Sequence, residues 1–150
     1  MVRETGLIEA HRSCIELAHS DTSHQIIGEF YRVYNTLGSG LTESVYQRAL
    51  VIALGMRGLR LAREVPMTVM FERQVVGEYR ADLVVENVIL VETKAVERLV
   101  RQHDAQVLNY LRISRLRVGL LFNFGPTAQF RRLISPVSAP TPEANSEQSV

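Results

Sequence analysis

Cysteine is nearly absent from the sequence, and so are long apolar runs. The single cysteine, Cys14, cannot form a disulfide within the chain and cannot supply the several thiolates of a structural zinc site. No apolar stretch approaches the roughly 18–20 residues that a membrane-spanning helix needs. Charged side chains such as Arg3, Glu9 and Arg12 interrupt the first 21 residues. We therefore expect no membrane span, no secretory signal peptide and a cytoplasmic location.

An excess of charge of one sign is also lacking, because the formal net charge is +1 at pH 7. The bias is slightly larger over residues 1–135, since Glu143 and Glu147 lie beyond them and no basic residue does. Such a small excess is compatible with a basic surface for nucleic acid but is no evidence for one. Lysine is scarcer still: Lys94 is the one lysine among 17 basic residues.

The hydrophobic pattern predicts one soluble α/β domain. Its 150 residues, 46% of them hydrophobic, suit a single core. Helical spacing of apolar residues predicts helices over residues 26–37, 42–56 and 101–114. Alternating or continuous apolar runs predict strands over residues 65–71, 75–85, 88–95, 118–124 and 129–134. The first three strands, joined by short turns, predict an antiparallel meander, with Pro66 near the start of the first.

The two ends of the chain differ in composition from the middle. Residues 1–23 have weak helical periodicity and are expected to form an N-terminal extension. Residues 24–135 carry the predicted helices and strands and form the expected domain. Residues 136–150 contain three prolines and almost nothing apolar to bury, so we expect a disordered tail.

Charged residues interrupt two of the apolar strands. Asp82 lies in the second strand, and Glu92 and Lys94 lie two residues apart in the third, so these two share a face. If Val85 pairs with Ile89 around a three-residue loop, Asp82 falls opposite Glu92, about 4.5–5.5 Å away between Cβ atoms. A two-residue turn would instead place the carboxylates on opposite faces.

Two interpretations of these charges remain open at this point. Adjacent carboxylates repel unless a cation lies between them, and oxygen ligands favour a hard ion such as Mg²⁺ or Mn²⁺. Such an ion can activate water for attack on a phosphate, and a neighbouring lysine can assist as a compact charge. The alternative is an ordinary ion pair at the sheet surface, either Asp82 with Lys94 or Glu92 with Arg80.

Two further polar residues could belong to the same site. Glu43 shares a face of the second predicted helix with Tyr46, and its alternative role is to complement the helix dipole. Gln106 shares a side of the third helix with Tyr110, where it could equally be a solvated edge. The histidines lack a zinc-ligand spacing, and no glycine-rich phosphate loop is present.

At these residues the sequence closely resembles the bacterial GxxExxY family of the PD-(D/E)XK nuclease-like superfamily. The resemblance covers about residues 24–134 and rests on five motifs in order: Gly40–Tyr46, Gly77–Asp82, Val91–Ala95, Ala105–Tyr110 and Leu120–Gly125. The chain departs from the superfamily pattern at two positions. Ala81 replaces the proline after which the superfamily is named, and Thr93 replaces an apolar residue, with its side chain expected to point away from the site.

The resemblance implies a restriction-endonuclease-like αβββαβ core, with a mixed sheet flanked by helices. It implies a metal held by Asp82, Glu92 and the backbone carbonyl of Thr93. In this pattern Glu43 is an additional carboxylate, Lys94 is the catalytic lysine, and Gln106 is a polar residue of the catalytic site.

We therefore expect a Mg²⁺- or Mn²⁺-dependent nuclease that hydrolyses DNA, with RNA as the second choice. The alternative is a catalytically silent nucleic-acid-binding or accessory module that retains the nuclease fold. The superfamily also implies action as a homodimer, and the modest charge is compatible with work inside a larger complex. No membrane partner is expected.

Overall fold

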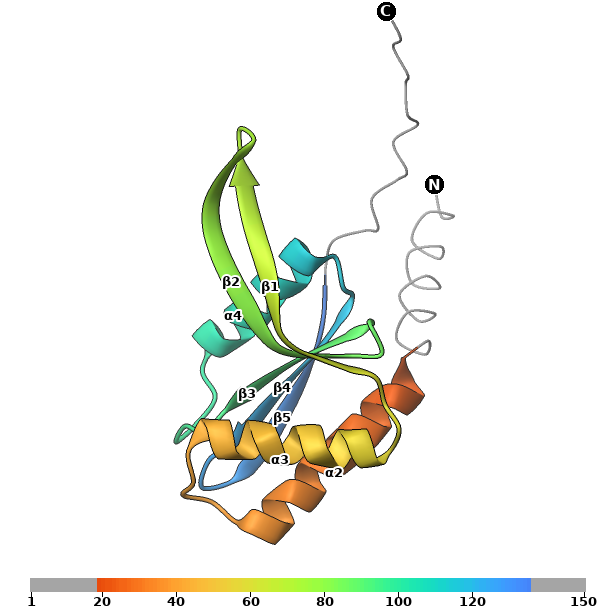
Figure 1. The fold of residues 1–150 in the computed structure, drawn as a ribbon. Coiled ribbons are helices and arrows are strands. Elements are labelled where there is room, and N and C mark those ends of the chain that lie inside the picture. Colours follow the sequence, from red (N-terminus) through yellow and green to blue (C-terminus); the bar gives the residue numbers. More distant parts are fainter. Residues whose placement is uncertain (1–18, 136–150) are drawn as a thin grey trace, which may run out of the picture.

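The computed structural model describes residues 19–135, which form helices and strands in the predicted order (Figure 1). The elements are α2 (Ser20–Leu37), α3 (Glu43–Met56), β1 (Leu61–Phe71), β2 (Gln74–Val85), β3 (Ile89–Lys94), α4 (Arg101–Ser114), β4 (Val118–Phe124) and β5 (Ala128–Ile134). Helix α2 begins at Ser20, so the folded region extends N-terminally beyond the predicted boundary at residue 24. The rest of the expected N-terminal extension and the expected tail lie outside the described residues. Within residues 19–135, no helix is long and apolar enough to cross a membrane.

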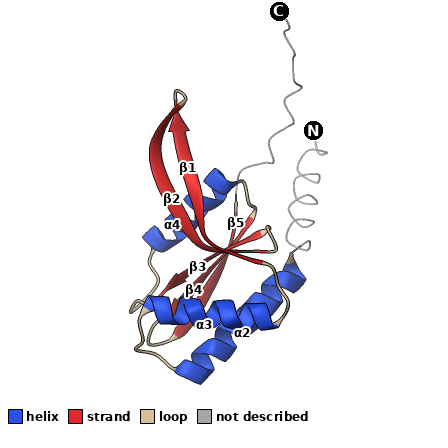
Figure 2. Ribbon diagram, viewed as in Figure 1, coloured by secondary structure: helices blue, strands red, loops and turns tan. Residues whose placement is uncertain are grey.

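The strands form one mixed sheet in the order β1-β2-β3-β4-β5. Neighbouring strands are antiparallel except β3 and β4, which are parallel and are connected through α4. Helices α2 and α3 cover one face of the sheet, and α4 covers the other (Figure 2). This is the single α/β domain with a mixed sheet flanked by helices that the sequence predicts, and it is consistent with a restriction-endonuclease-like core.

Aromatic stacking joins the α2–α3 layer to the centre of the sheet. The ring of Phe30 stacks on Phe122 at a centroid distance of 4.3 Å, and Tyr46 stacks on Phe124 at 4.5 Å. All four rings are almost completely buried. Strands β3 and β4 lie between two helical layers, which explains why their sequences are nearly continuous apolar runs rather than alternating ones.

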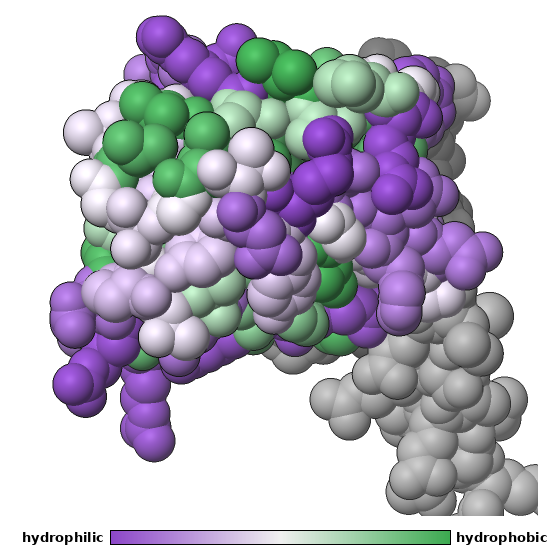
Figure 3. Space-filling view, turned by 90° about the horizontal axis from the view of Figure 1, so that it is seen from below, coloured by the Kyte–Doolittle hydropathy of each residue, from purple (hydrophilic) through white to green (hydrophobic). Residues whose placement is uncertain are grey.

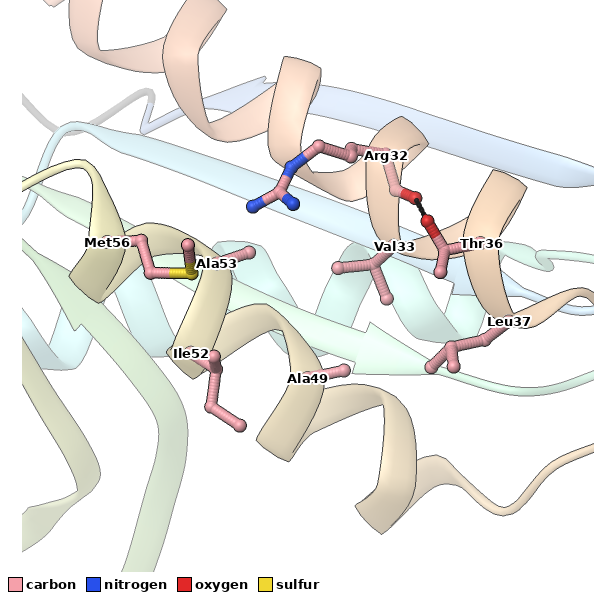
Figure 4. A pocket seen from close by; sticks show the side chains of 8 residues that line it. All are labelled: Arg32, Val33, Thr36, Leu37, Ala49, Ile52, Ala53 and Met56. Carbon is pink, nitrogen blue, oxygen red and sulfur yellow. Dashed lines mark hydrogen bonds between the residues drawn. The ribbon is translucent and has the colours of Figure 1, made fainter.

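The surface of the helical layer carries apolar side chains that do not reach the sheet. Seen from below, the molecule shows separate groups of hydrophobic side chains among hydrophilic ones (Figure 3). A shallow, mostly apolar groove runs between α2 and α3, with Val33 and Leu37 on one side and Ala49, Ile52 and Met56 on the other (Figure 4). None of the residues predicted to carry chemistry lines this groove.

Strands β1 and β2 form a long hairpin that projects beyond the rest of the sheet (Figure 1). The first strand begins at Leu61 rather than at Val65. The prediction that Pro66 lies near the start of the strand is therefore wrong, and Pro66 lies inside it. This position is tolerated because β1 is an edge strand, where one side of the backbone has no partner strand.

In both strands of the hairpin, the side chains that face a given side of the sheet change near Glu64 and Asp82. Leu61 and Leu83 pack beneath α2 and α3, whereas Val65 and Ala81 pack against α4. Residues separated by an even number of positions face the same side in a regular strand, so the strands are irregular between these pairs. Glu64 has a φ of 47°, and the β1–β2 pairing skips both Glu64 and Asp82. The hairpin therefore changes face at the position of a predicted site residue.

We predict that Gly119→Ala destabilises the fold. A Cβ at Gly119 would lie 2.6 Å from Val107 Cγ1 and 3.2 Å from Leu111 Cδ1, both on α4. Moving α4 away from β4 should cost about 1–3 kcal/mol in the free energy of unfolding, measured by urea denaturation. The matched control is Gly28→Ala in α2, where a Cβ meets nothing within 4 Å. It should be neutral or stabilise by up to about 1 kcal/mol, and equal effects of the two substitutions would contradict the packing argument.

Candidate functional site

Asp82 and Glu92 meet where β2 separates from β3. Of the two registers that the sequence left open, the structure has the one with a three-residue loop, because Val85 pairs with Ile89 and Leu83 with Val91. Beyond Leu83, the side-chain carboxylates of Asp82 and Glu92 accept the hydrogen bonds that backbone carbonyls would accept in a regular ladder. The Asp82 backbone N–H donates to Glu92 Oε1 at 3.0 Å, and the Thr93 backbone N–H donates to Asp82 Oδ2 at 2.9 Å. Each carboxylate is thus held against the backbone of the other strand.

Thr93 contributes to the site in a way that the sequence pattern did not indicate. Its side chain was expected to point away, but its hydroxyl donates to Asp82 Oδ2 at 3.1 Å. The expectation assumed a regular β3 facing a regular β2. Because β2 leaves the ladder at Asp82, the aspartate side chain reaches the gap between the strands, where both the backbone and the hydroxyl of Thr93 are accessible to it.

Glu92 is a buried carboxylate with a strongly perturbed pKa. Its exposed fraction is 2%. Burial raises the pKa of Glu92 to about 8, and the negative charge of Asp82 adds to this effect, while the Asp82 N–H and the Lys94 ammonium oppose it. In the metal-free protein at neutral pH, this raised pKa favours the protonated form of Glu92. At neutral pH the metal-free site therefore favours one ionised carboxylate over two.

Lys94 and Glu43 lie within electrostatic reach of this pair. Lys94 follows Glu92 on the same face of β3 and is half-buried. Glu43 is in the first turn of α3, and burial raises its pKa, while Lys94 lowers it and Asp82 raises it. Helix α3 therefore brings Glu43 toward the same charged residues that meet at the end of the β2–β3 ladder.

The surface ion pairs considered as an alternative do not form. Arg80 pairs with Glu64 at 3.8 Å on the exposed hairpin and not with Glu92. Within residues 19–135, no ion pair joins Lys94 to Asp82 or Glu92. Within the same residues, no three His, Cys, Asp or Glu side chains are already grouped as metal ligands. One oxygen of each carboxylate, Asp82 Oδ2 and Glu92 Oε1, instead accepts a hydrogen bond from a backbone N–H of the other strand.

The polar side of α4 borders the site. Gln106 Nε2 donates to the Tyr110 hydroxyl at 3.0 Å. Burial raises the pKa of Tyr110, and the charges of Glu92 and Asp82 raise it further. Gln106 is therefore half-buried on the side of α4 that faces the carboxylates, rather than at a fully solvated helix edge.

Tyr46 fixes the loop that precedes α3 through hydrogen bonds of its hydroxyl. Its ring is fully buried, and its hydroxyl donates to the carbonyl oxygen of Gly38 at 2.5 Å and accepts from the Leu41 N–H at 3.2 Å. Gly40, in the same loop, has a φ of 99°, which favours glycine. The glycine, glutamate and tyrosine of the G-x-x-E-x-x-Y motif thus form one unit that fixes where Glu43 begins the helix.

Asn123 holds the backbone that follows Lys94, and the sequence reasoning missed it. Its side chain is fully buried, donates to the Val96 carbonyl at 2.9 Å and accepts from the Val96 N–H at 3.0 Å. Gly125 permits this close approach, since a Cβ there would lie 1.9 Å from the Val96 carbonyl oxygen. An asparagine inside the apolar strand β4 is the signal that could have found it.

We predict that the stability of the metal-free protein falls as pH rises from about 4.5 toward about 8. In this window folded Glu92 keeps a proton that the unfolded chain releases, because its pKa changes from about 8 to 4.5 on unfolding. Glu92→Gln removes this titration and should gain stability relative to wild type as pH rises through the window. Melting temperatures in EDTA across this range measure the difference. A difference that does not change with pH would contradict the prediction.

We predict that Tyr46→Phe destabilises the protein by about 1–2 kcal/mol, because it removes both hydroxyl hydrogen bonds and leaves the stack on Phe124 in place. The control is Tyr31→Phe, at a partly exposed tyrosine of α2, which should change stability by less than about 0.5 kcal/mol. Urea denaturation compares the two variants. Equal midpoints for Tyr46→Phe and wild type would show that the loop does not depend on the hydroxyl.

The comparisons with known proteins concern the fold and the family of the chain. None of the curated proteins matches the chain. Among solved structures, the crystal structure of SSO0001 is similar, with a TM-score of 0.53 and 18% sequence identity. The similar region covers 83% of this chain but 63% of the SSO0001 chain, and at this identity it shows the fold alone. The sequence model of the PD-(D/E)XK nuclease superfamily matches residues 20–133, most of the chain. The chain therefore belongs to the PD-(D/E)XK nuclease superfamily.

Proposed function

We propose that this protein is a nuclease of the GxxExxY type that hydrolyses phosphodiester bonds, with DNA as the first substrate to test and RNA as the second. The observation that carries the proposal is the contrast between two buried glutamates. Glu29 is 3% exposed and binds Arg32 and Arg57, each at 2.6 Å. Burial opposes its ionisation, but the two arginines lower its pKa. Glu92 is equally buried and has no arginine partner.

A buried carboxylate without a directly paired cation is costly, and structural needs alone do not explain it. Replacing Glu92 with glutamine would keep an acceptor for the Asp82 N–H and remove the cost of the charge, so this hydrogen bond alone does not require a carboxylate. The neighbouring Asp82 increases the cost, since it raises the pKa of Glu92 further. Perturbed carboxylates of this kind are typical of functional sites, and a divalent cation would relieve the repulsion.

The donor chemistry fits Mg²⁺ or Mn²⁺. The available ligands are the carboxylates of Asp82, Glu92 and Glu43 and the backbone carbonyl of Thr93, all of them oxygens, which hard cations prefer. When bound, such an ion lowers the pKa of a coordinated water and neutralises charge on the scissile phosphate. We assign the binding of this ion to these four residues.

The remaining residues act on the substrate and the attacking water. Lys94 is the one lysine of the sequence, and its compact ammonium lies close enough to Glu92 and Glu43 to lower the pKa of both. It is suited to orient the water and to stabilise the charge that develops on the phosphate. Gln106 can hydrogen-bond the phosphate from α4. Asn123 and Tyr46 keep Lys94 and Glu43 in place without touching the substrate.

The proton on Glu92 makes metal binding dependent on pH. A cation must displace this proton, so the affinity for Mg²⁺ should rise with pH up to about 8, where Glu92 ionises without help.

We predict that Lys94→Ala and Glu92→Gln abolish cleavage, with a loss on the order of 100-fold or more, while both variants stay folded. The assay uses plasmid DNA, oligonucleotides and RNA with Mg²⁺ or Mn²⁺, against EDTA. Mg²⁺ should raise the melting temperature of wild type and leave that of Glu92→Gln nearly unchanged. The matched control is Glu72→Gln, an exposed acid at the hairpin turn, which should behave as wild type.

Two outcomes would contradict the proposal in different ways. If neither metal changes the wild-type melting temperature at millimolar concentration, and both variants melt early, then the carboxylates and Lys94 have a structural role. If metal binds but no substrate is cut, the protein is a nucleic-acid-binding or accessory module that retains the nuclease fold.

A further inference from the structure

Tyr79 is an exposed aromatic side chain close to the acidic site, and the proposed mechanism gives it no role. It lies three residues before Asp82 on β2, within the Gly77–Asp82 motif. Its exposed fraction is 47%, whereas that of Tyr110 is 8%. The two rings have centroids 5.9 Å apart and planes tilted by 47°. The Tyr79 ring is thus half-exposed to solvent and lies beside the buried ring of Tyr110.

The backbone of β2 positions the Tyr79 ring. A Cβ at Gly77 would lie 3.3 Å from Tyr79 Cε2, so the glycine leaves the space beside the ring open. Tyr79 lies two residues before Ala81, so both side chains point to the same face of β2. Because Ala81 packs against α4, the Tyr79 ring lies on the α4 side of the hairpin. Gly77 and Tyr79 of the motif thus lie together on this part of β2.

Tyr110 connects this ring to the carboxylates. Gln106 holds the Tyr110 hydroxyl at 3.0 Å, and the charges of Glu92 and Asp82 act on the same hydroxyl. The Tyr79 ring, the Tyr110 ring and the acidic pair therefore follow one another along the side of the site formed by β2 and α4. A nucleotide whose phosphate lies at Asp82 and Glu92 would have its base within reach of Tyr79.

We propose that Tyr79, supported by Tyr110, is a stacking platform for a nucleobase beside the scissile phosphate, and that the preferred substrate has unpaired bases there: single-stranded nucleic acid, or the frayed or flapped end of a duplex. The inference rests on the proposed nuclease function. A base can stack on Tyr79 only if one of its faces is free, and in a closed duplex both faces are covered by neighbouring bases. Stacking on an aromatic ring also tolerates any base.

Stacking can supplement the affinity that basic side chains supply to any nucleic acid. Binding to a closed duplex depends largely on neutralising phosphates with basic side chains, and the formal net charge here is only +1. Stacking supplies affinity that does not depend on charge. The exposed ring of Tyr79 can therefore add affinity for a flexible strand that a rigid duplex, with its bases stacked on one another, does not gain.

The test compares Tyr79→Ala, Tyr79→Phe and Tyr79→Leu with wild type. The probe is an oligonucleotide carrying one 2-aminopurine, either single-stranded or closed into a hairpin duplex, titrated in Ca²⁺ to measure binding. Tyr79→Ala and Tyr79→Leu should lose about tenfold in affinity for the single strand, and Tyr79→Phe should keep it. Duplex affinity should stay unchanged in all three variants. The matched control is Phe71→Ala, an exposed aromatic at the hairpin tip, which should bind as wild type does.

Binding and cleavage separate the two proposals. If wild type binds the single strand through Tyr79 but cuts nothing in Mg²⁺, the platform stands and the nuclease function fails. If wild type cuts, and Tyr79→Ala binds and cuts both probes as wild type does, the nuclease stands and the platform is wrong. The platform is also wrong if Tyr79→Ala loses affinity equally for single strand and duplex, or if wild type binds neither probe.

Discussion

The separation of β2 from β3 at Asp82 is the constraint on which the rest of this structure depends. Below this point the two strands pair through their backbones; at it, the Asp82 N–H turns to Glu92, and the Thr93 N–H turns to Asp82. Carboxylates that replace ladder hydrogen bonds satisfy the backbone and, at the same time, place two acidic groups side by side. The opening of the sheet and the creation of the acidic site are therefore one structural event.

The same event determines the shape of the hairpin. Once β2 is free of β3, it can turn over together with β1, and the positive φ of Glu64 marks the turn in the partner strand. Beyond it Ala81 and Val65 pack against α4 rather than beneath α3. This change of face brings Tyr79 to the α4 side, next to Tyr110. A regular hairpin would present the tyrosine to the opposite side, away from the helix that carries Gln106.

Electrostatics explains why such a site needs a rigid scaffold. Glu29 shows what this chain does with a buried carboxylate in a structural role: it provides two arginines. Glu92 has no arginine partner, and burial raises its pKa. The scaffold therefore has to keep Glu43 and Lys94 in position beside the two carboxylates. The Tyr46 hydroxyl fixes the loop before α3 by donating a hydrogen bond to Gly38. The Asn123 side chain fixes the backbone just beyond Lys94 through its hydrogen bonds with Val96.

Much of this could be predicted from the sequence alone, because local periodicity and short turns are local properties. The bounds of α4 and β4 match their predicted ranges, and the Val85–Ile89 pairing follows from a three-residue loop between two apolar strands. That register was enough to place Asp82 opposite Glu92, and the motif spacing was enough to name Glu43 and Lys94 as their companions.

The tertiary structure decided whatever depends on how distant segments meet. The early start of β1 at Leu61, the inward turn of the Thr93 hydroxyl and the clamp by Asn123 have no periodic signature, since each depends on a strand irregularity or on a contact across the sheet. The raised pKa of Glu92 is of the same kind, because desolvation is a property of the packed layers and not of the residue. The sequence determined which charged groups lie on these strands, whereas the packing of α3 and α4 around the open end of the sheet determined their electrostatic environment.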